Sequence, residues 1–203
     1  GAATGKTLAE AYKRALECDP VSAFGGVIGV NRAIDAEAAE EMHKLFLEVI
    51  AAPGFDEAAK AKFATKKNLR LVEVVPKNQK WVLKNVSGGM LVQDNDLHIL
   101  EDADLRVVTK RPPTPEETRA LLFAWKVCKH VRSNAIVLGR ELATIGIGAG
   151  QMSRVDSVRI AIDKARESRP AHLDGSVMAS DGFFPFADGP QAGIEAGVKA
   201  IIQ

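Results

Sequence analysis

Three glycines at alternating positions lie just ahead of a serine and an arginine, and these residue types suit the binding of an anion. Gly146, Gly148 and Gly150 lack a Cβ, so backbone N–H groups can approach a ligand closely. Ser153 can cap the helix predicted by the amphipathic run that follows, and Arg154 can supply a planar positive fork. Because helix N-termini favour negative charge, the segment indicates a cradle for a phosphate or a nucleotide.

The same glycines fit a second interpretation. Their spacing is not the G-x-G-x-x-G fingerprint of dinucleotide-binding folds, and no acidic residue clearly follows a second strand to hold a ribose. A tight turn between a strand and a helix accounts for them equally well on pattern alone. Other residues must therefore decide between the two.

The composition of the chain is that of an ordinary globular protein. Its 203 residues are 46% hydrophobic, enough for one large core or two small ones. Lys and Arg (27) nearly balance Asp and Glu (26), so no global charge favours nucleic acid. Cys18 and Cys128 form no C-x-x-C pair, which fits a reducing compartment. Without an apolar stretch of membrane-spanning length or a signal-peptide core at the N-terminus, we expect a soluble, cytoplasmic protein.

Helical and extended segments alternate along the first half, which predicts an α/β fold. Helical periodicity is found at residues 8–16, 36–46 and 56–64, and extended apolar runs are found at 27–30, 49–52, 71–75, 87–93 and 105–109. The polar residues 76–85 are expected to form a loop.

The proline-rich segment 111–117 is the best boundary signal. Its prolines end the preceding strand, while Thr114 and Glu117 form a capping box with Pro115 at the first helical position. The sequence therefore predicts two units, residues 1–110 and 111–203, the second opening with a helix that runs to about Lys129. The elements expected after it are strands at 134–138, 144–147, 176–180 and 198–202, and helices from about 155 and at 189–197.

Eight short motifs then occur in an order that resembles a known family. They are Ser22–Gly26, Glu48–Pro53, Lys66–Arg70, Gly88–Asp94, Val108–Arg111, Ser133–Ala135, Ile145–Arg154 and Ser180–Phe186. Together they span essentially the whole chain and are similar to the transformylase domain of the bifunctional AICAR transformylase/IMP cyclohydrolase family. The resemblance implies two cytidine-deaminase-like α/β/α subdomains with mixed sheets, without the deaminase zinc.

The resemblance also implies a reaction in purine (IMP) biosynthesis. A formyl group moves from the cosubstrate 10-formyltetrahydrofolate to the exocyclic amine of 5-aminoimidazole-4-carboxamide ribotide, with no metal required. The implied assembly is a homodimer that completes the active site at its interface, and neither nucleic acid nor membrane is an implied partner.

Five residues correspond to ribotide contacts of that family, and most of them have a plainer alternative. Asn134 matches an amide near the carboxamide and the transferring group, which implies a catalytic role; an Asn at the start of a strand is often only a turn residue. Gly25 matches a residue whose backbone approaches the ribotide, or it is a turn ahead of a strand. Glu48 matches an acidic contact to the nucleotide, or it is a surface charge. Arg154 matches a nucleotide-contacting arginine, and Phe183 matches a ring that packs on the ligand, or belongs to a satellite core.

Two further residues correspond to folate contacts, namely Val155 and Asp188, although Asp188 could equally cap a helix before Gly189. The family's catalytic Lys-His pair would directly precede Gly1, and the cyclohydrolase domain and the C-terminal tail have no counterpart here, so we expect the chain alone to turn over little or not at all. Lys129-His130 belongs to a different segment and is expected to be a solvated helix end.

Three other functions are weighed against this one. The segment Gly1–Thr7 approaches a nucleotide triphosphatase loop, but its spacing fails by one residue and no strand precedes it in the chain. A zinc deaminase would need H-x-E and P-C-x-x-C motifs, which the sequence lacks. The third is a non-enzymatic, ligand-binding or dimerisation fragment.

Overall fold

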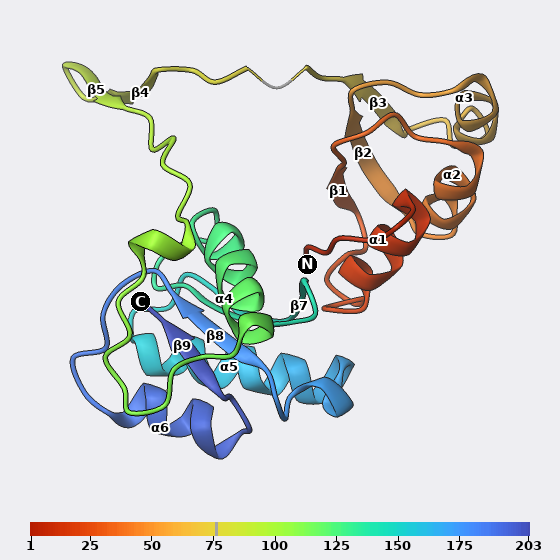
Figure 1. Cartoon of the computed structure of the whole chain (residues 1–203). Helices are drawn as coiled ribbons and strands as arrows, with labels where there is room; N and C mark the ends of the chain where they lie inside the picture. Colours follow the sequence, from red (N-terminus) through yellow and green to blue (C-terminus); the bar gives the residue numbers. More distant parts are fainter. Residues whose placement is uncertain (76) are drawn as a thin grey trace.

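The computed structural model describes residues 1–75 and 77–203, and within them it holds a mixed α/β arrangement of six α-helices and three small sheets (Figure 1). The first part contains α1 (Leu8–Leu16), β1 (Gly26–Gly29), α2 (Ala36–His43), β2 (Leu47–Ala52), α3 (Glu57–Phe63) and β3 (Arg70–Glu73). The middle contains β4 (Trp81–Val86), β5 (Gly89–Asp94) and the 3-10 helix η1 (Asp102–Asp104). The last part contains α4 (Pro115–Cys128), β6 (Ile136–Arg140), β7 (Ala143–Gly148), α5 (Arg154–Ser168), the 3-10 helix η2 (Pro170–His172), β8 (Val177–Ser180), α6 (Asp188–Glu195) and β9 (Ala200–Ile202).

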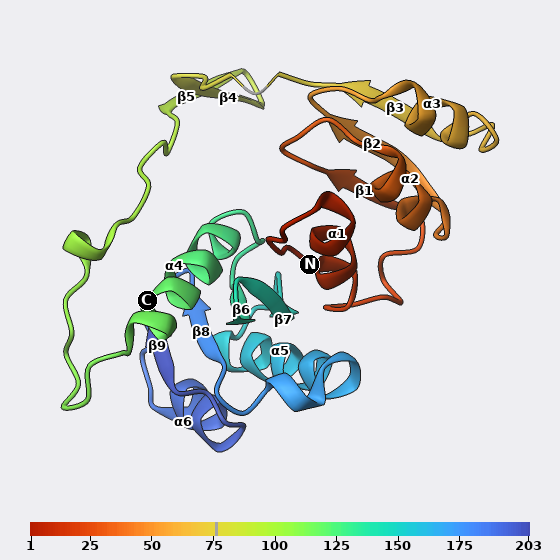
Figure 2. The ribbon, with the colours of Figure 1, turned by 45° about the vertical axis from the view of Figure 1, so that its right-hand side comes forward.

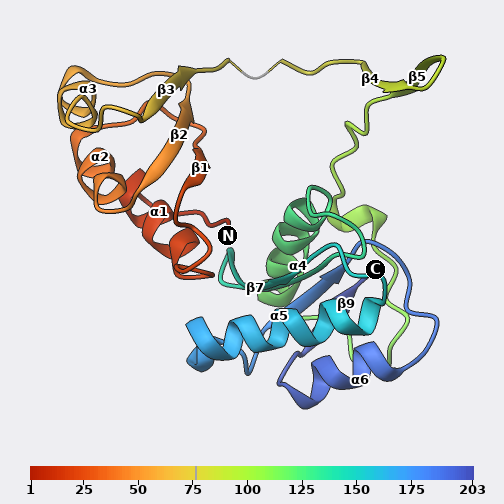
Figure 3. The same ribbon diagram turned by 180° about the vertical axis from the view of Figure 1, so that it is seen from behind.

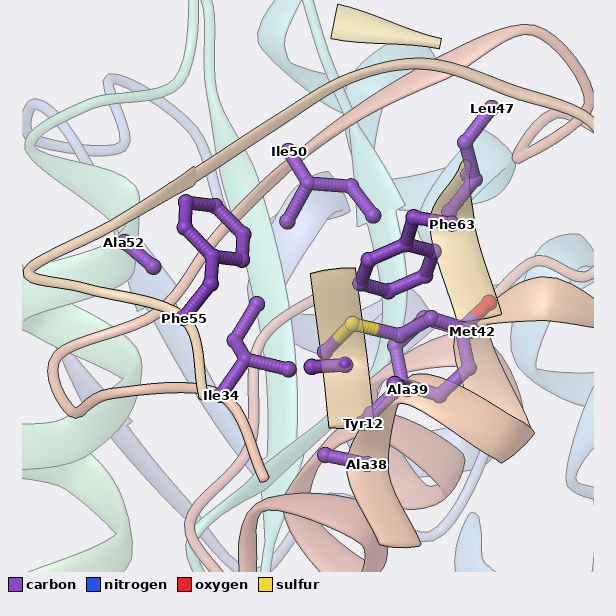
Figure 4. Packing of buried hydrophobic residues seen from close by; sticks show 11 residues of the cluster. Tyr12, Ile34, Ala38, Ala39, Met42, Leu47, Ile50, Ala52, Phe55 and Phe63 are labelled. Atoms are coloured by element: carbon purple, nitrogen blue, oxygen red, sulfur yellow. The ribbon is translucent and has the colours of Figure 1, made fainter. Parts of the chain in front are cut away.

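Residues 1–75 form a parallel sheet with helices on one face. Thr7, Asp35 and Asp56 each begin a helix by accepting the backbone N–H three residues on. The strands lie in the order β1-β2-β3, and one cluster of buried side chains packs the three helices against them (Figure 4). The opposite face carries Val27, which is 69% exposed. The described part of this unit therefore has two layers and a purely parallel sheet, which differs from the expected α/β/α arrangement with a mixed sheet.

A hairpin of β4 and β5 projects on extended segments that connect the two larger units (Figures 1 and 3). The loop expected at residues 76–85 is wrong from Trp81 onward, because these residues pair in antiparallel register with β5. Pro76, also part of that expectation, lies outside the described residues. The strand expected at 105–109 is wrong as well, because these residues are irregular and follow η1.

Residues 115–202 form a three-layered unit around a mixed sheet of order β7-β6-β8-β9. Ile136 and Leu138 on β6 pack with α5 and α6, whereas Val137 between them packs with α4. This alternation is what a strand covered on both faces requires, and α4 lies on one side of the sheet with α5 and α6 on the other (Figure 2). The expected capping box of Thr114 and Glu117 is confirmed by both of its hydrogen bonds.

The N-terminal residues join the two units. Ala2 and Thr4 run along the edge of β7, where Thr144 N–H donates to the Ala2 carbonyl at 2.9 Å and Thr4 N–H donates to the Leu142 carbonyl at 3.0 Å. An ion pair of Lys164 with Asp19 at 3.1 Å ties α5 to the loop after α1. The division of the chain at residue 110 remains a prediction.

Candidate functional site

Arg154 is the centre of a polar cluster at the start of α5. Its Nη1 donates to Ser180 Oγ at 2.9 Å and to the Asp181 carboxylate, and its Nη2 donates to Asn134 Oδ1 at 2.8 Å. The Arg154 side chain is 16% exposed and that of Asp181 is 17% exposed. These bonds occupy three of the five N–H donors of the guanidinium, so the group is held in place and keeps donors for a ligand.

Asn134 is oriented from both ends of its side-chain amide. Its Nδ2 donates to the carbonyls of Gln151 at 2.9 Å and Met152 at 3.0 Å, while its Oδ1 accepts from Arg154. The segment between β7 and α5 therefore sets the position of Asn134, which just precedes β6. Two of the predicted site residues, Asn134 and Arg154, are in direct contact.

Asp181 is the counter-ion that sequence reasoning did not single out. Burial by itself would raise the pKa of Asp181, but hydrogen bonds from Arg154 and from the Ala135 backbone N–H at 3.0 Å hold that pKa below its ordinary value. The carboxylate is therefore ionised near neutral pH. The sequence did contain one signal for Asp181, because this residue directly follows the strand predicted at 176–180. In the structure that strand is β8, and it pairs with β6 so that Ser180 lies opposite Ile136.

The glycines ahead of α5 have a packing role. A Cβ added at Gly146 would lie 2.1 Å from the Ala161 carbonyl oxygen, and one at Gly148 would lie 1.8 Å from the Ser157 carbonyl oxygen. Gly150 adopts a φ of 70°, and its N–H donates to the Arg132 carbonyl at 2.7 Å, so it is not free to bind a ligand. The structure thus favours close strand-to-helix packing over an anion cradle for these three glycines.

Ser153 also differs from expectation. It stands at the N-cap position of α5, but its side chain makes no capping hydrogen bond. Within the first turn of α5, Ser157 Oγ donates to the Asn134 carbonyl at 2.8 Å, which ties the helix to the residue before β6.

The phenylalanine loop begins beside the guanidinium. A Cβ at Gly182 would lie 2.8 Å from Arg154 Nη2, so the backbone passes directly over this group. The next residue, Phe183, is 73% exposed, whereas Phe184 packs against the core beneath α6. The satellite-core alternative therefore applies to Phe184, and Phe183, the residue after Gly182, is left as an exposed aromatic ring.

The two predicted folate contacts lie at helix starts. Val155 is the second residue of α5 and is half-buried. Asp188 is the exposed first residue of α6, and its carboxylate accepts the Gly189 N–H at 2.8 Å. The N-cap of α6 is Ala187, so Asp188 is not the capping residue that the alternative interpretation required.

Gly25 and Glu48 lie in the other unit. Gly25 adopts a φ of 71° and donates its N–H to the Phe46 carbonyl at 2.9 Å, and Gly26 pairs with Leu47, the residue before Glu48. The pair therefore sits at the starting ends of β1 and β2. Among the hydrogen bonds and ion pairs of the described residues, none joins this pair to Arg154 or Asn134.

A cleft of about 800 Å³ separates the first unit from β7 and α5. Ser22, Ala23 and Gly26 line it from the side of Gly25, and Ile147 and Lys164 line it from the other side. The Arg154 cluster does not reach this cleft, so the chain presents the predicted site residues as two separate groups.

A second cavity, of about 600 Å³, adjoins the Arg154 cluster through Asp181 and lies at the end of α4. Lys129 closes one side, because its Nζ lies 3.0 Å from the Asp96 carboxylate and donates to the Asp96 and His98 carbonyls at 2.6 and 3.2 Å. Lys129, the C-cap of α4, and His130 are both exposed, as expected for a helix end, and Lys129 in addition pairs with the Asp96 segment. Burial raises the pKa of the Cys128 thiol on this wall to about 12, so it is not a nucleophile.

The structure argues against the nucleotide triphosphatase alternative. Thr7 caps α1 by accepting the Glu10 N–H, and the residues before it pair with β7, so the Gly1–Thr7 segment is not a phosphate loop between a strand and a helix. In residues 1–75 and 77–203, no group of three or more His, Cys, Asp or Glu side chains is placed to hold a metal ion. Within the same residues no helix combines the length and the apolar character needed to cross a bilayer.

Comparison with known proteins gives a consistent picture. The model of the AICARFT/IMPCHase bienzyme family matches residues 1–164. The bifunctional purine biosynthesis protein PurH of Chelativorans sp. (strain BNC1) is 57% identical over 212 residues, covering 100% of this chain and 40% of that protein. The PurH proteins of Agrobacterium fabrum (strain C58) and Rhodospirillum rubrum are each 54% identical over 213 residues with the same coverage. The chain thus spans about 40% of the length of these curated relatives.

Proposed function

The chain belongs to the AICARFT/IMPCHase bienzyme family, and from that membership we propose that it serves formyl transfer from 10-formyltetrahydrofolate to 5-aminoimidazole-4-carboxamide ribotide. In this reaction the exocyclic amine forms a C–N bond to the formyl carbon, the bond from that carbon to N10 of the folate breaks, and the amine proton passes to N10. Under this proposal the two units correspond to the two cytidine-deaminase-like subdomains, and the protein acts in the cytoplasm.

The observation that carries the proposal is the Arg154–Asn134 contact, together with the exposed ring of Phe183 in the residue after Gly182, whose backbone lies close to Arg154. A fixed guanidinium with free donors suits the anionic and carbonyl groups of a ribotide, and a flat base suits an exposed aromatic ring. The oriented amide of Asn134 would position the carboxamide next to the amine that reacts. These residues bind and orient, which lowers the barrier by holding the reacting atoms in line.

The folate would lie on the same side of the unit. The exposed carboxylate of Asp188 fits the N–H donor edge of a pterin, and Val155 offers an apolar contact at the start of α5. The folate supplies the activated formyl carbon. Gly25 and Glu48 would contact the ribotide from a second copy of the chain, because within one chain they form a separate group.

Binding without turnover is a second candidate function. The titratable group at the centre of the cluster, Asp181, is held as a carboxylate by Arg154 and is a poor proton acceptor for an amine. Its neighbours Asn134 and Ser180 carry an amide and a hydroxyl, neither of which is a proton acceptor for an amine. Formyl transfer assayed with the chain, against ribotide binding measured on the same sample, separates the two functions.

Calorimetric titration with the ribotide tests the site. Phe183→Ala should weaken ribotide binding about tenfold, since a stacked aromatic pair contributes on the order of 1 kcal/mol beyond its buried area. Phe186→Ala is the matched control, because Phe186 is 74% exposed in the same loop but is not adjacent to Gly182, whose backbone lies close to Arg154. Arg154→Ala should abolish the measurable heat in a protein whose thermal melt shows that it is folded.

Equal titrations for Phe183→Ala and Phe186→Ala would refute the assignment of the ring. No ribotide heat with the unmodified chain, whether alone or at concentrations where two copies associate, would refute the proposed function itself.

A further inference from the structure

Ser180 lies between the guanidinium of Arg154 and the loop that carries Phe183. Its hydroxyl accepts a hydrogen bond from Arg154 Nη1 at 2.9 Å and donates one to the Gly182 carbonyl at 2.7 Å. Ser180 is the last residue of β8 and is 0% exposed. One buried hydroxyl therefore connects a cation on α5 with the backbone two residues further along its own chain.

The direction of both hydrogen bonds is determined by their partners. A guanidinium only donates and a carbonyl only accepts, so the single hydroxyl proton of Ser180 must point at the Gly182 carbonyl. A hydroxyl that accepts from a cation becomes a stronger donor, because hydrogen bonds in a chain polarise one another. The contact with Arg154 therefore strengthens the bond that holds Gly182.

The Gly182 carbonyl belongs to the peptide plane that ends in the N–H of Phe183. Fixing this plane sets the direction in which the chain enters Phe183, whose ring is 73% exposed. Phe184 is held independently, since its N–H donates to Gln203 Oε1 at 2.9 Å and its side chain packs against the core. Phe183 thus lies between two fixed peptide units, the first of which depends on Ser180.

The bonds of Arg154 also determine which of its donors can meet a ligand. Both N–H groups of Nη1 are used, one by Ser180 and one by the Asp181 carboxylate, while Nη2 donates to Asn134 Oδ1. Among the contacts of the described residues, the donors that remain are the second N–H of Nη2 and that of Nε. A Cβ added at Gly182 would lie 2.8 Å from Nη2, so the remaining donor on Nη2 and the start of the phenylalanine loop are neighbours.

We propose that Ser180 is a positioning residue of the candidate site, which couples the phenylalanine loop to Arg154 so that the ring and the cation meet one ligand together. The inference rests on the proposed function, because that ligand is the ribotide. Ser180 acts through its neighbours, since its side chain is buried and its hydroxyl bonds go to Arg154 and Gly182. A buried strand end held by packing alone would favour an apolar residue, because a buried hydroxyl is costly unless it is hydrogen-bonded.

Nuclear magnetic resonance tests the coupling without a ligand. With ¹³C-carbonyl glycine and ¹⁵N phenylalanine, only two peptide groups give a correlated signal, because Gly-Phe occurs only at 54–55 and 182–183. Ser180→Ala should shift the 182–183 signal, since that carbonyl loses a hydrogen bond, and should leave the 54–55 signal in place. Ser176→Ala is the matched control, because Ser176 is equally buried just before β8 and its hydroxyl makes no hydrogen bond within the described residues.

Ser180→Cys separates hydrogen bonding from packing. A thiol fills about the same space as the hydroxyl but is a weaker donor and acceptor. Under the proposal, Ser180→Cys should shift the 182–183 signal in the same direction as Ser180→Ala does. A signal that stays in place in both variants, or that moves as far in Ser176→Ala, would overturn the proposal.

Ribotide titration tests what the coupling does for binding. Ser180→Ala should weaken ribotide binding about tenfold, and adding Phe183→Ala to this variant should cost less than about threefold, because a ring that is no longer positioned has little left to contribute. Additive losses would show that Ser180 does not act through the ring and would overturn the proposal. If the unmodified chain binds no ribotide while Ser180→Ala shifts the 182–183 signal, the proposed function fails and the coupling of the loop to Arg154 stands.

Discussion

Replacing Asp181 by asparagine removes one charge from the centre of the Arg154 cluster while keeping the shape of the side chain. The Asp181 carboxylate accepts from Arg154 Nη1 and from the Ala135 N–H, and both partners can still be met by an amide oxygen. What is lost is the charge that strengthens these two bonds. The substitution therefore measures how far this part of the fold depends on ionisation rather than on packing.

The expected cost follows from burial. The two side chains of the pair are 16% and 17% exposed, so water screens them only partly. Each hydrogen bond to a charged group contributes about 1.5–3 kcal/mol. Because the introduced amide can still accept both bonds as a neutral group, we expect the free energy of unfolding to fall by about the contribution of one charged bond rather than two. In a protein of this size, that loss corresponds to a decrease in melting temperature of roughly 3–12 °C.

The same pair predicts a pH dependence. The native pKa of Asp181 lies below its ordinary value, so the unfolded chain binds the proton more readily than the folded one. The stabilisation by Asp181 is therefore fully present above the unfolded pKa of about 3.9, and it is lost as the pH falls from there through the lowered native pKa. The unmodified chain should lose more stability over this range than Asp181→Asn does.

Urea unfolding followed by circular dichroism, at one fixed protein concentration, measures both effects. Glu116→Gln is the control, because it breaks an exposed pair with Arg119 and should leave the unfolding midpoint unchanged. A loss below about 0.5 kcal/mol for Asp181→Asn, or an equal acid dependence of the two proteins, would show that the Arg154–Asp181 pair carries no net stabilisation.

Two further predictions concern packing and the cavity beside α4. Gly148→Ala should lower the free energy of unfolding by about 1–3 kcal/mol or more, because the added Cβ would lie 1.8 Å from a carbonyl oxygen of α5. Gly89→Ala is the control, because a Cβ there meets nothing within 4 Å, and the urea midpoint of this variant should equal that of the unmodified chain. Lys129→Met should release the Asp96 segment and speed its limited proteolysis several-fold, with Lys126→Met as the control; equal cleavage rates would mean that Lys129 does not hold the segment.

Local signals in the sequence predicted the regular elements of the second unit well. Thr114 and Glu117 define the start of α4 through contacts within one helical turn, and such contacts can be inferred from spacing alone. The hairpin was missed for the opposite reason. Its strands are buried on neither face, so Lys84 and Asn85 stand among apolar residues with no clean period, and the segment resembles a polar loop.

The cluster around Arg154 shows where reasoning from spacing ends. Asn134 and Arg154 were identified through a family resemblance, but the counter-ion Asp181 comes from a strand 27 residues further on and meets them only because β8 pairs with β6. The alternating glycines, which first suggested a ligand, are explained by the close contact of β7 with α5. Within residues 145–154, the glycines therefore serve packing, and Arg154 is the residue that belongs to the candidate site.

Under the proposed function, the site has two halves, one with Arg154 and Asn134 and one with Gly25 and Glu48, and the pairing of Arg154 with Asp181 affects how these halves come together. A bare guanidinium at a subunit interface would oppose association until an anion arrived, because its desolvation would be uncompensated. Here Asp181 pairs with that charge before any ligand binds, while the remaining N–H donors stay oriented. Under the proposed function, the half of the site that contains Arg154 can therefore form before ribotide binds. Under the proposed function, the ribotide then completes a preformed pocket rather than organising one, which requires that Arg154→Ala reduce ribotide binding while the dimer persists.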